Sequence, residues 1–271
     1  MATSTAPAVR YSTAKVATSK EAQAFSWEAP VPVNRFWDDF DYCLSRNFLG
    51  NFTNDELRSQ QSAIDPDSEA PKTEKLELLL RLLEEKLATE EEVSVVWFDA
   101  PLHVREYKRW QSLVQGIYTM QDALDRLDDA EKSIRLLVDR CPPGGGQQDE
   151  NGSSSSLVSS ANVGALHMLG DHLVKMKKFV EAEETALPVR EWMDASPKLG
   201  RDSPQALGSR RIILRALWGQ GPERKADAEA VLAEIYAIIE DLGTGTSRFS
   251  VYQEEEKEII DKMVKDLAPR D

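Results

Sequence analysis

The sequence predicts an all-α fold, and three observations lead to this prediction. Between residues 75 and 267, apolar residues recur at spacings of three and four, the period of one face of an amphipathic helix. Short stretches rich in Pro, Gly, Asp and Ser separate these periodic segments and predict turns. The 271 residues are 41% hydrophobic, which is enough for a core. The sequence contains no run of about 18 apolar residues, so no membrane span is predicted.

The most regular stretch, 161–242, predicts two consecutive pairs of antiparallel helices. In each pair, apolar and small residues recur on both sides of a break, and small residues let the two helices approach closely. In the first pair, which breaks at 177–178, these residues are Leu166, Leu169, Gly170, Leu173, Phe179, Ala182, Ala186 and Val189. In the second pair, which breaks at 219–223, they are Ile213, Leu214, Leu217, Ala228, Leu232 and Ile235.

This unit resembles a tetratricopeptide repeat, a helix-turn-helix of about 34 residues with Leu-Gly in the first helix and a small Ala in the second. Leu169-Gly170 matches the first feature, and Glu-Ala-Glu at 181–183 and Asp-Ala-Glu at 227–229 match the start of the second helix. The connector at 199–207 is similar to that of the kinesin-light-chain-type variant. A degenerate third copy is placed upstream, where Asp-Ala-Glu at 129–131 follows Val114, Ile117 and Tyr118.

The resemblance covers about half of the chain and implies an antiparallel helix-pair solenoid with helical N- and C-terminal caps. The final periodic segment, 249–267, is expected to be the C-terminal cap, with Glu254, Glu255, Glu256 and Lys257 on its exposed face. The expected organisation is a tail at 1–24, an N-terminal helical region at 25–140, a Pro/Gly/Ser-rich loop or linker at 141–160, and the repeats with their cap at 161–271.

The first 24 residues are rich in Ala, Ser and Thr, carry three basic residues and have no acid before Glu21. This composition predicts a disordered tail, and the alternative is a mitochondrial transit peptide. Because no apolar signal segment is present, we expect a cytoplasmic protein, with mitochondria as the alternative compartment.

The segment 25–52 is dense in aromatic residues interleaved with Asp. Phe36, Trp37, Phe40 and Leu44 have the spacing of one short amphipathic helix, with Asn34 as its N-cap. Two roles are open for the segment: a cap over the exposed end of the helix stack, or an aromatic and acidic docking segment.

Further helices are predicted at 75–88, from Thr89 to residue 100, at 104–120 and at 127–138. Thr89 and Glu92 have the spacing of a capping box that opens the second of these helices. The apolar run of Val93, Val95, Val96, Trp97 and Phe98 contains β-branched residues but is assigned to a helix rather than a strand, and Pro101 ends it. The Pro/Gly/Ser run 141–156 either separates two domains or forms a long loop within one solenoid.

Catalytic, metal-binding and cofactor-binding patterns are not found in the sequence. Cys43 and Cys141 match no metal or redox spacing, and His167 and His172 point about 140° apart on one helix. A Gly-rich phosphate loop and a nucleophile elbow are also missing. The net charge of −14 argues against nucleic-acid binding, which needs a basic surface. We expect no cofactor and no metal, and whether the chain is an enzyme stays open.

The repeat resemblance implies that the first helix of each pair lines a concave groove. The polar residues on that face are His167, Asp171, Lys175, Arg211, Arg215 and Trp218. Basic groups in so acidic a chain predict an anionic ligand such as an acidic peptide or a C-terminal carboxylate. The alternative is that Arg211 and Arg215 pair with acids of the neighbouring helix, for instance Glu183 or Glu184.

The function expected from these patterns is non-catalytic: an adaptor or scaffold that binds a peptide or partner helix in a concave groove. The alternative is an all-α enzyme or small-molecule-binding protein, with a pocket between the N-terminal aromatic helices and the repeats. Self-association through an exposed repeat face is a third possibility, so the expected partners are proteins or peptides.

Overall fold

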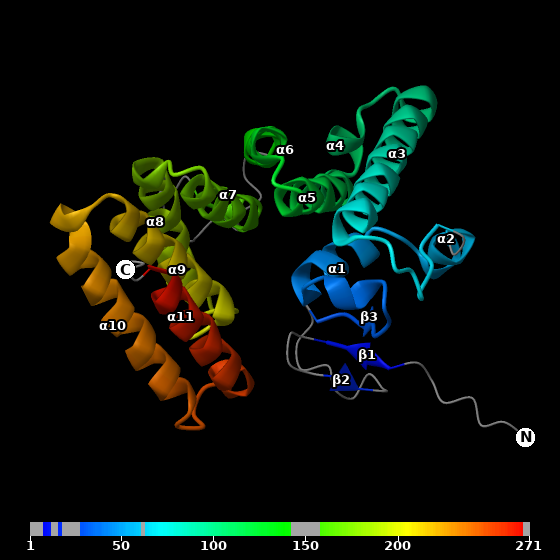
Figure 1. The fold of residues 1–271 in the computed structure, drawn as a ribbon. Helices are drawn as coiled ribbons and strands as arrows, with labels where there is room; N and C mark the ends of the chain where they lie inside the picture. Colours follow the sequence, from blue (N-terminus) through cyan, green and yellow to red (C-terminus); the bar gives the residue numbers. More distant parts are fainter. Residues whose placement is uncertain (1–7, 12–15, 18–27, 61–62, 142–157, 268–271) are drawn as a thin grey trace, which may run out of the picture. The chain divides into compact units, whose positions relative to one another are not determined.

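The computed structural model describes residues 8–11, 16–17, 28–60, 63–141 and 158–267. The chain divides into two compact units, Met1–Ile134 and Arg135–Asp271, and each is described by itself (Figure 1). The described residues are mostly helical, which confirms the all-α prediction.

The helices of unit 1 are α1 (Tyr42–Leu49), α2 (Asn54–Ser59), α3 (Lys72–Phe98), α4 (Leu102–Arg105) and α5 (Tyr107–Ala123), and α6 (Leu127–Asp139) crosses the unit boundary. Those of unit 2 are α7 (Val163–Lys175), α8 (Phe179–Ala195), α9 (Pro204–Gly219), α10 (Lys225–Leu242) and α11 (Gln253–Leu267).

A small antiparallel sheet begins unit 1. Its strands, β1 (Val9–Arg10), β2 (Val16–Ala17) and β3 (Val31–Pro32), lie in the order β2-β1-β3. The guanidinium of Arg10 also donates to the carbonyl oxygens of Trp37 and Phe40, at 2.9 and 2.8 Å. The expected disordered tail therefore does not hold for residues 8–11 and 16–17. The other residues of 1–24 lie outside the described part of the chain.

The aromatic segment forms two short helical pieces instead of the one helix that its spacing predicts. Trp37–Asp39 is a 3-10 helix, the chain is extended at Phe40 (φ −116, ψ 148), and α1 begins after Asp41. The break has a local cause, because the Asp41 carboxylate accepts from the backbone N–H of Leu44 at 2.8 Å and so caps a new helix. Asn34 is the predicted cap, and its side-chain oxygen accepts from Trp37 N–H at 3.1 Å, but on the 3-10 turn.

The aromatic side chains are core residues of unit 1. Phe36, Trp37, Phe40 and Phe48 are buried and pack at ring-centroid distances of 5.0 to 6.1 Å, mostly edge to face. Buried rings cannot contact a partner protein, so these four do not form the docking segment that was one of the two expected roles.

Helix α3 is one continuous helix, whereas two helices were predicted over this stretch. Thr89 lies in its interior, where the hydroxyl donates to the Glu85 carbonyl at 2.9 Å, so it is not an N-cap. The helical assignment of 93–98 is confirmed, and the helix ends at Phe98 with Asp99 in the left-handed conformation (φ 50). Leu76, Leu79, Leu80 and Leu83 form its buried stripe.

The segment after α3 is also divided differently from the prediction. The single helix expected at 104–120 is interrupted at Glu106 (φ −135, ψ 63), which separates α4 from α5. Helix α6 agrees with the expected helix at 127–138. Of the predicted loop or linker at 141–160, residues 142–157 lie outside the described part of the chain.

Unit 2 contains the helix pairs that the periodicity predicts, with breaks in the expected places. Lys177 (φ 59) and Gly221 (φ 110) adopt left-handed conformations in the two turns. Helices α7 to α10 pack each on the next, and α7 also packs on α9 (Figure 1). A Cβ atom at Gly170 would lie 3.4 Å from the Ile212 side chain and 3.6 Å from Ala186, so this glycine lies where helices approach closely.

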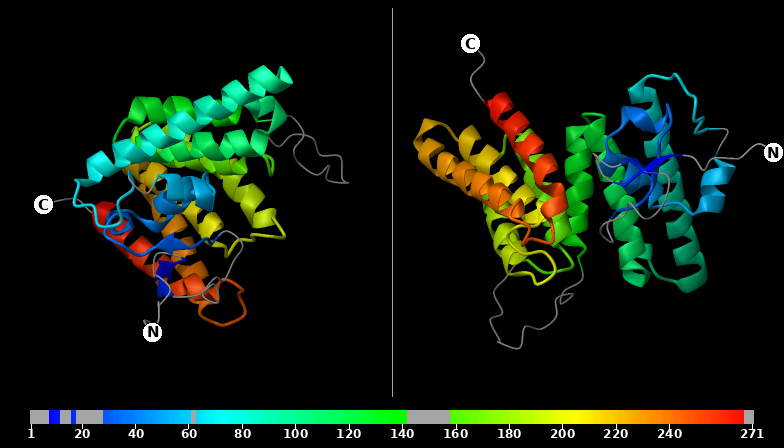
Figure 2. Two further views of the ribbon diagram at one scale, coloured as in Figure 1. Left: turned by 90° about the vertical axis from the view of Figure 1, so that its right-hand side faces the viewer. Right: turned by 90° about the horizontal axis from the view of Figure 1, so that it is seen from below.

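Helix α11 covers α9 and α10, and Figure 2 shows it from two further directions. Ile260 and Tyr252 are buried, and Ile259, Met263, Val264 and Leu267 are half-buried. Glu256 was expected on the exposed face of this helix. That prediction is wrong, because Glu256 is 3% exposed. No helix in the described part of the chain is long and apolar enough to cross a membrane.

Candidate functional site

The predicted groove residues lie on α7 and α9, but their charges are engaged within the protein. Asp171 of α7 pairs with Arg215 of α9, and Lys175 lies 3.9 Å from the other oxygen of the same carboxylate. One acid is thus shared by two cations. An incoming carboxylate would compete with Asp171 for both of them.

Arg211, one turn earlier on α9, is paired with Glu256 of α11. Burial raises the pKa of the Glu256 carboxyl, and the charge of Arg211 opposes that rise. Internal pairing was one of the two expected alternatives, but the acids are not those suggested. Glu183 pairs with Arg224 at 2.8 Å, and the acids that pair with Arg215 and Arg211 are Asp171 and Glu256.

His167 contacts Ser209, and the pair has the composition of a catalytic dyad. The His167 Nδ1 atom lies 3.1 Å from the Ser209 hydroxyl oxygen. Burial lowers the pKa of His167 to about 4; the nearby Arg211 and Arg215 also lower it and Asp171 opposes them, so the ring is neutral at pH 7. Ser209 is 0% exposed and its hydroxyl donates to the Met193 sulfur at 3.2 Å. A hydroxyl so enclosed cannot reach a substrate, and the dyad packs α7 against α9.

Trp218 completes the predicted set and is half-buried on the last turn of α9. The structure therefore brings five of the six predicted residues into one region of α7 and α9, with Trp218 one turn further along. One donor of that region is unsatisfied: Arg215 Nε is buried and has no hydrogen-bond partner among the described residues.

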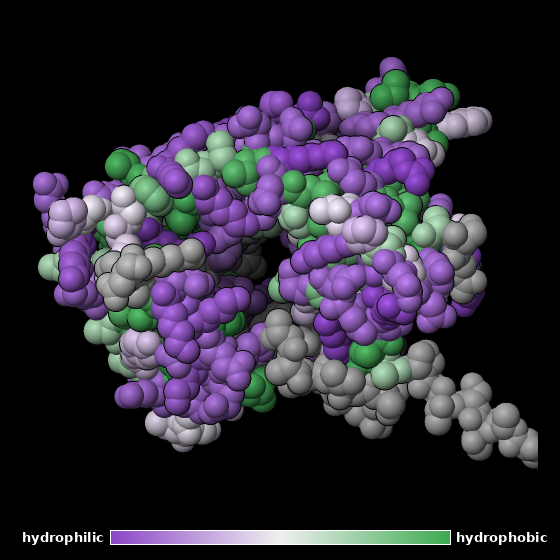
Figure 3. All heavy atoms as spheres, in the orientation of Figure 1, coloured by the Kyte–Doolittle hydropathy of each residue, from purple (hydrophilic) through white to green (hydrophobic). Residues whose placement is uncertain are grey.

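A surface that the sequence analysis missed lies at the C-terminal end of α3. We call it the α3 apolar end, and Figure 3 shows hydrophobic residues there. Its members are exposed apolar side chains: Val93, Val95, Val96, Trp97, Phe98 and Val104. Trp97 is 77% exposed and Val96 is 68% exposed. The sequence signal is an apolar run at 93–98 that only Ser94 interrupts, and its β-branching raises only the choice between helix and strand.

The α3 apolar end is held in place by contacts with α4. The Ser94 hydroxyl donates to the Ala100 carbonyl at 2.7 Å, and the Glu91 carboxylate accepts from Leu102 N–H at 2.8 Å. The Arg105 guanidinium lies over the Phe98 ring at 4.0 Å and pairs with Glu106 at 2.8 Å. The exposed apolar groups therefore belong to a defined helix end and not to a loop.

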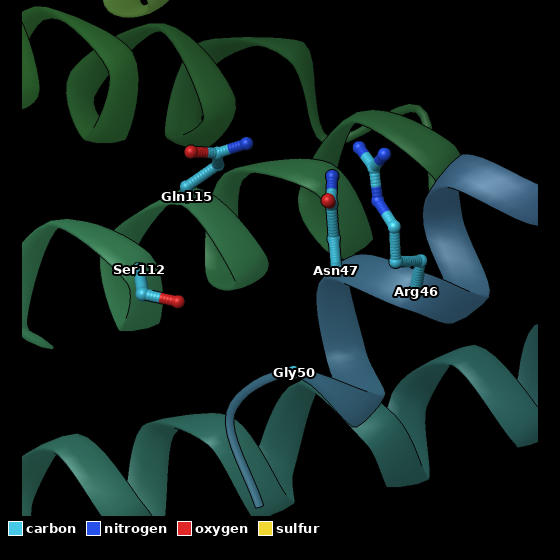
Figure 4. Close-up of a pocket in the computed structure, with 5 residues that line it drawn as sticks. All are labelled: Arg46, Asn47, Gly50, Ser112 and Gln115. Atoms are coloured by element: carbon cyan, nitrogen blue, oxygen red, sulfur yellow. The ribbon is translucent and has the colours of Figure 1, made fainter. Parts of the chain in front are cut away.

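Unit 1 also contains a polar hollow of about 200 Å³ between α1 and α5 (Figure 4). Its lining residues are Arg46, Asn47, Gly50, Ser112 and Gln115. Asn51 forms a fixed wall beside it, donating to the Asn47 carbonyl at 2.7 Å and the Ser112 carbonyl at 3.1 Å. The hollow is smaller than the roughly 300–1,000 Å³ of typical ligand pockets, and its lining includes no carboxylate or histidine.

Within the described ranges, no three His, Cys, Asp or Glu side chains are grouped so that they could hold a metal ion. Comparison of the chain with protein-family models, curated proteins and solved structures finds no match.

Proposed function

We propose that this chain is a non-catalytic protein-interaction module and that the α3 apolar end is its main docking surface. The observation that carries the proposal is the exposure of Trp97, Phe98 and Val96 together at the end of one fixed helix, at 77%, 55% and 68%. An exposed apolar patch on a folded protein usually marks a site of interaction.

The energetic argument concerns the two aromatic rings. A buried aromatic side chain removes about 150–250 Å² from water, and burial is worth about 25 cal/mol per Å². Covering Trp97 and Phe98 would therefore contribute several kcal/mol to binding, before the entropy cost of association. Aromatic residues of this kind are typical hot spots of protein interfaces.

We also propose that α7 to α11 form a short tetratricopeptide-like solenoid, with α11 as its C-terminal cap. The order of contacts supports this arrangement, since α9 packs on α7, α8 and α10 and α11 covers α9. The face formed by His167, Asp171, Lys175, Arg211, Arg215 and Trp218 is the second candidate docking surface, for an acidic peptide. The unsatisfied Arg215 Nε favours it, and the internal ion pairs of Asp171 and Glu256 count against it.

The test of the main proposal is capture of a partner from native lysate by the full chain and by two surface variants. Val96→Ser/Trp97→Ser removes the apolar end, and Val180→Ser/Val251→Ser removes two exposed valines of unit 2 as a control. We expect the first variant to lose a partner that the wild type and the control retain, with unchanged helical circular dichroism. If all three proteins retain the same partner, the α3 apolar end is not the docking surface.

The variant Lys175→Glu tests the second surface independently of the first. It reverses the charge of an exposed side chain on the α7 and α9 face. Lys175 is a suitable position because its side chain is exposed and its contact with the Asp171 carboxylate is long, 3.9 Å, so the substitution should not unfold the protein. Loss of a partner with Lys175→Glu, and not with Val96→Ser/Trp97→Ser, would transfer the function to α7 and α9.

The alternative function, small-molecule binding, has one observation in its favour. The hollow between α1 and α5 is lined by donor groups of Arg46, Asn47, Ser112 and Gln115, which would suit a small carboxylate. Thermal stabilisation by small carboxylates that disappears in Gln115→Leu would support it. If none of these compounds changes the melting temperature, small-molecule binding at this hollow is ruled out.

A further inference from the structure

The chemistry of the α3 apolar end and its surroundings also identifies the kind of partner. We infer that the partner is an amphipathic α-helix whose apolar stripe is bordered by Lys and Arg side chains. This inference rests on the proposed function, because it names the partner class of the same surface.

The shape of the surface favours a helix. Val93, Val96 and Trp97 are spaced three and four residues apart, and at 100° per residue they lie within one 100° sector of α3. They form a ridge one turn long on a convex helix end. A ridge of this spacing fits the groove between the side-chain rows of another helix.

The charge beside the ridge favours a basic partner. Glu85 and Glu92 are exposed and, by the same helical angle, project on the side of α3 that carries Val96. Asp99, which is also exposed, directly follows the last residue of the helix. Arg105 is already engaged with Glu106 and with the Phe98 ring. The chain as a whole carries a net charge of −14. Cations flanking the partner's apolar stripe would meet this acidic rim and speed association.

The same charges disfavour other occupants. A second copy of the chain would bring its own Glu85, Glu92 and Asp99 against the same rim, and like charges placed face to face in an interface are costly. An acidic helix would be repelled in the same way. The acidic peptide expected for α7 and α9 is therefore not the ligand expected here.

The test uses two designed helical peptides of about 20 residues, long enough to form isolated helices in part. Both carry Leu at the stripe positions; the other positions are mainly Lys in one peptide and mainly Glu in the other. Binding to the full chain is measured by fluorescence anisotropy. We expect the Lys peptide to bind at least tenfold more tightly than the Glu peptide, with an affinity that falls as salt rises from about 50 to about 200 mM.

Two variants locate the binding. Val96→Ser/Trp97→Ser should weaken the Lys peptide at least tenfold, because it removes the aromatic anchor. Glu85→Lys/Glu92→Lys should weaken it about tenfold and reduce the salt dependence. The matched control, Glu223→Lys/Glu240→Lys, makes the same change of net charge at exposed positions of unit 2 and should stay within about twofold of wild type.

Equal losses in the rim variant and in its control would overturn the inference, because the peptide would then be responding to net charge alone. A wild-type dimer in sedimentation equilibrium that Trp97→Ser converts to monomer would also overturn it, in favour of a second copy. If the lysate partner depends on the α3 apolar end but the two peptides bind alike, the proposed function stands and the partner class is wrong. If neither the partner nor the peptides depend on it, both fail.

Discussion

At the scale of single residues, Arg210 shows how a buried cation stabilises unit 2. Its side chain is 1% exposed and donates to both Asp194 oxygens at 2.9 and 2.8 Å and to a Glu234 oxygen at 3.0 Å. Arg210→Met would remove the buried cation that faces both Asp194 and Glu234, so we expect a loss of about 3 kcal/mol in the free energy of unfolding. Arg201→Met, at an exposed position that pairs with the same Glu234 at 3.2 Å, should cost less than about 1 kcal/mol. Urea denaturation followed by circular dichroism measures both, and equal losses would contradict the assigned role of Arg210.

His167 gives a pH-dependent prediction. Its pKa in the folded protein, about 4, lies below the ordinary value of 6.5, chiefly because of burial. As pH falls from 6.5 to 4, the unfolded chain takes up a proton that the folded chain does not, so the folded state loses up to about 3 kcal/mol. Above pH 6.5 the His167 ring is neutral in both the folded and the unfolded chain, so its protonation no longer changes the free energy of unfolding. The stability difference between wild type and His167→Gln should therefore change over this window, and a difference that is constant with pH would show that the ring is not excluded from protonation.

At the scale of secondary-structure elements, Arg211 and Arg215 fix α9 to different neighbours with different strength. Arg211 reaches the buried Glu256 of α11, whose side chain is 4% exposed, whereas Asp171, the partner of Arg215, is 37% exposed. At pH 7.5 we expect Arg211→Gln to lower the free energy of unfolding by about 3 kcal/mol, because it leaves a buried charge unpaired, and Arg215→Gln to cost less than about 1 kcal/mol.

The loss in Arg211→Gln should shrink at lower pH. Burial raises the pKa of Glu256, and without Arg211 the opposing attraction is gone, so the carboxyl becomes neutral more readily as the solution is acidified. A neutral carboxyl costs less to bury than an unpaired carboxylate. Unfolding free energies at pH 7.5 and pH 5 check this, and a loss that is equal at both would contradict the buried-charge explanation.

The helices of unit 2 could be predicted from the sequence because their period and their breaks are local signals. The left-handed Lys177 and Gly221 lie in breaks that the sequence marks with Lys-Lys and Gly-Gln-Gly-Pro. In unit 1 local signals misled: Thr89 has the spacing of a capping box, yet α3 continues through it. Inside the helix the Thr89 hydroxyl donates to the Glu85 carbonyl, the bond that a threonine makes in a helix interior instead of a cap.

The candidate site was predicted less well, for a physical reason. Helical spacing places Asp171 of α7 and Arg215 of α9 on the predicted groove face. The partner of Arg211, in contrast, comes from α11, 45 residues further along the chain. Glu256 lies in a run of three acidic residues, and composition cannot tell which of them faces the core. The apolar run 93–98 was visible, but its exposure depends on how far α3 extends beyond the helices that cover it.

At the scale of the whole molecule, the two units separate the two candidate surfaces. The α3 apolar end lies in Met1–Ile134, and the α7 and α9 face lies in Arg135–Asp271. Each unit has its own buried residues: the aromatic and leucine core in the first, and in the second a cluster that includes Val158, Val189, Met193 and Ala206. A mutation at one surface can therefore be tested without disturbing the core beneath the other.

This separation leads to a prediction for two fragments, 1–139 and 127–271, which both include α6 because the unit boundary falls inside it. Helix α6 is needed by the second fragment because Arg135 pairs with Glu181 of α8 at 2.7 Å. We expect both fragments to be helical and to unfold cooperatively, since each contains a compact unit. The Lys peptide should bind fragment 1–139 with the affinity of the full chain and should bind 127–271 at least tenfold more weakly. Tighter binding to 127–271 would place the binding site of the Lys peptide on unit 2, where Lys175, Arg211 and Arg215 lie. Attraction between opposite charges could then not explain the binding.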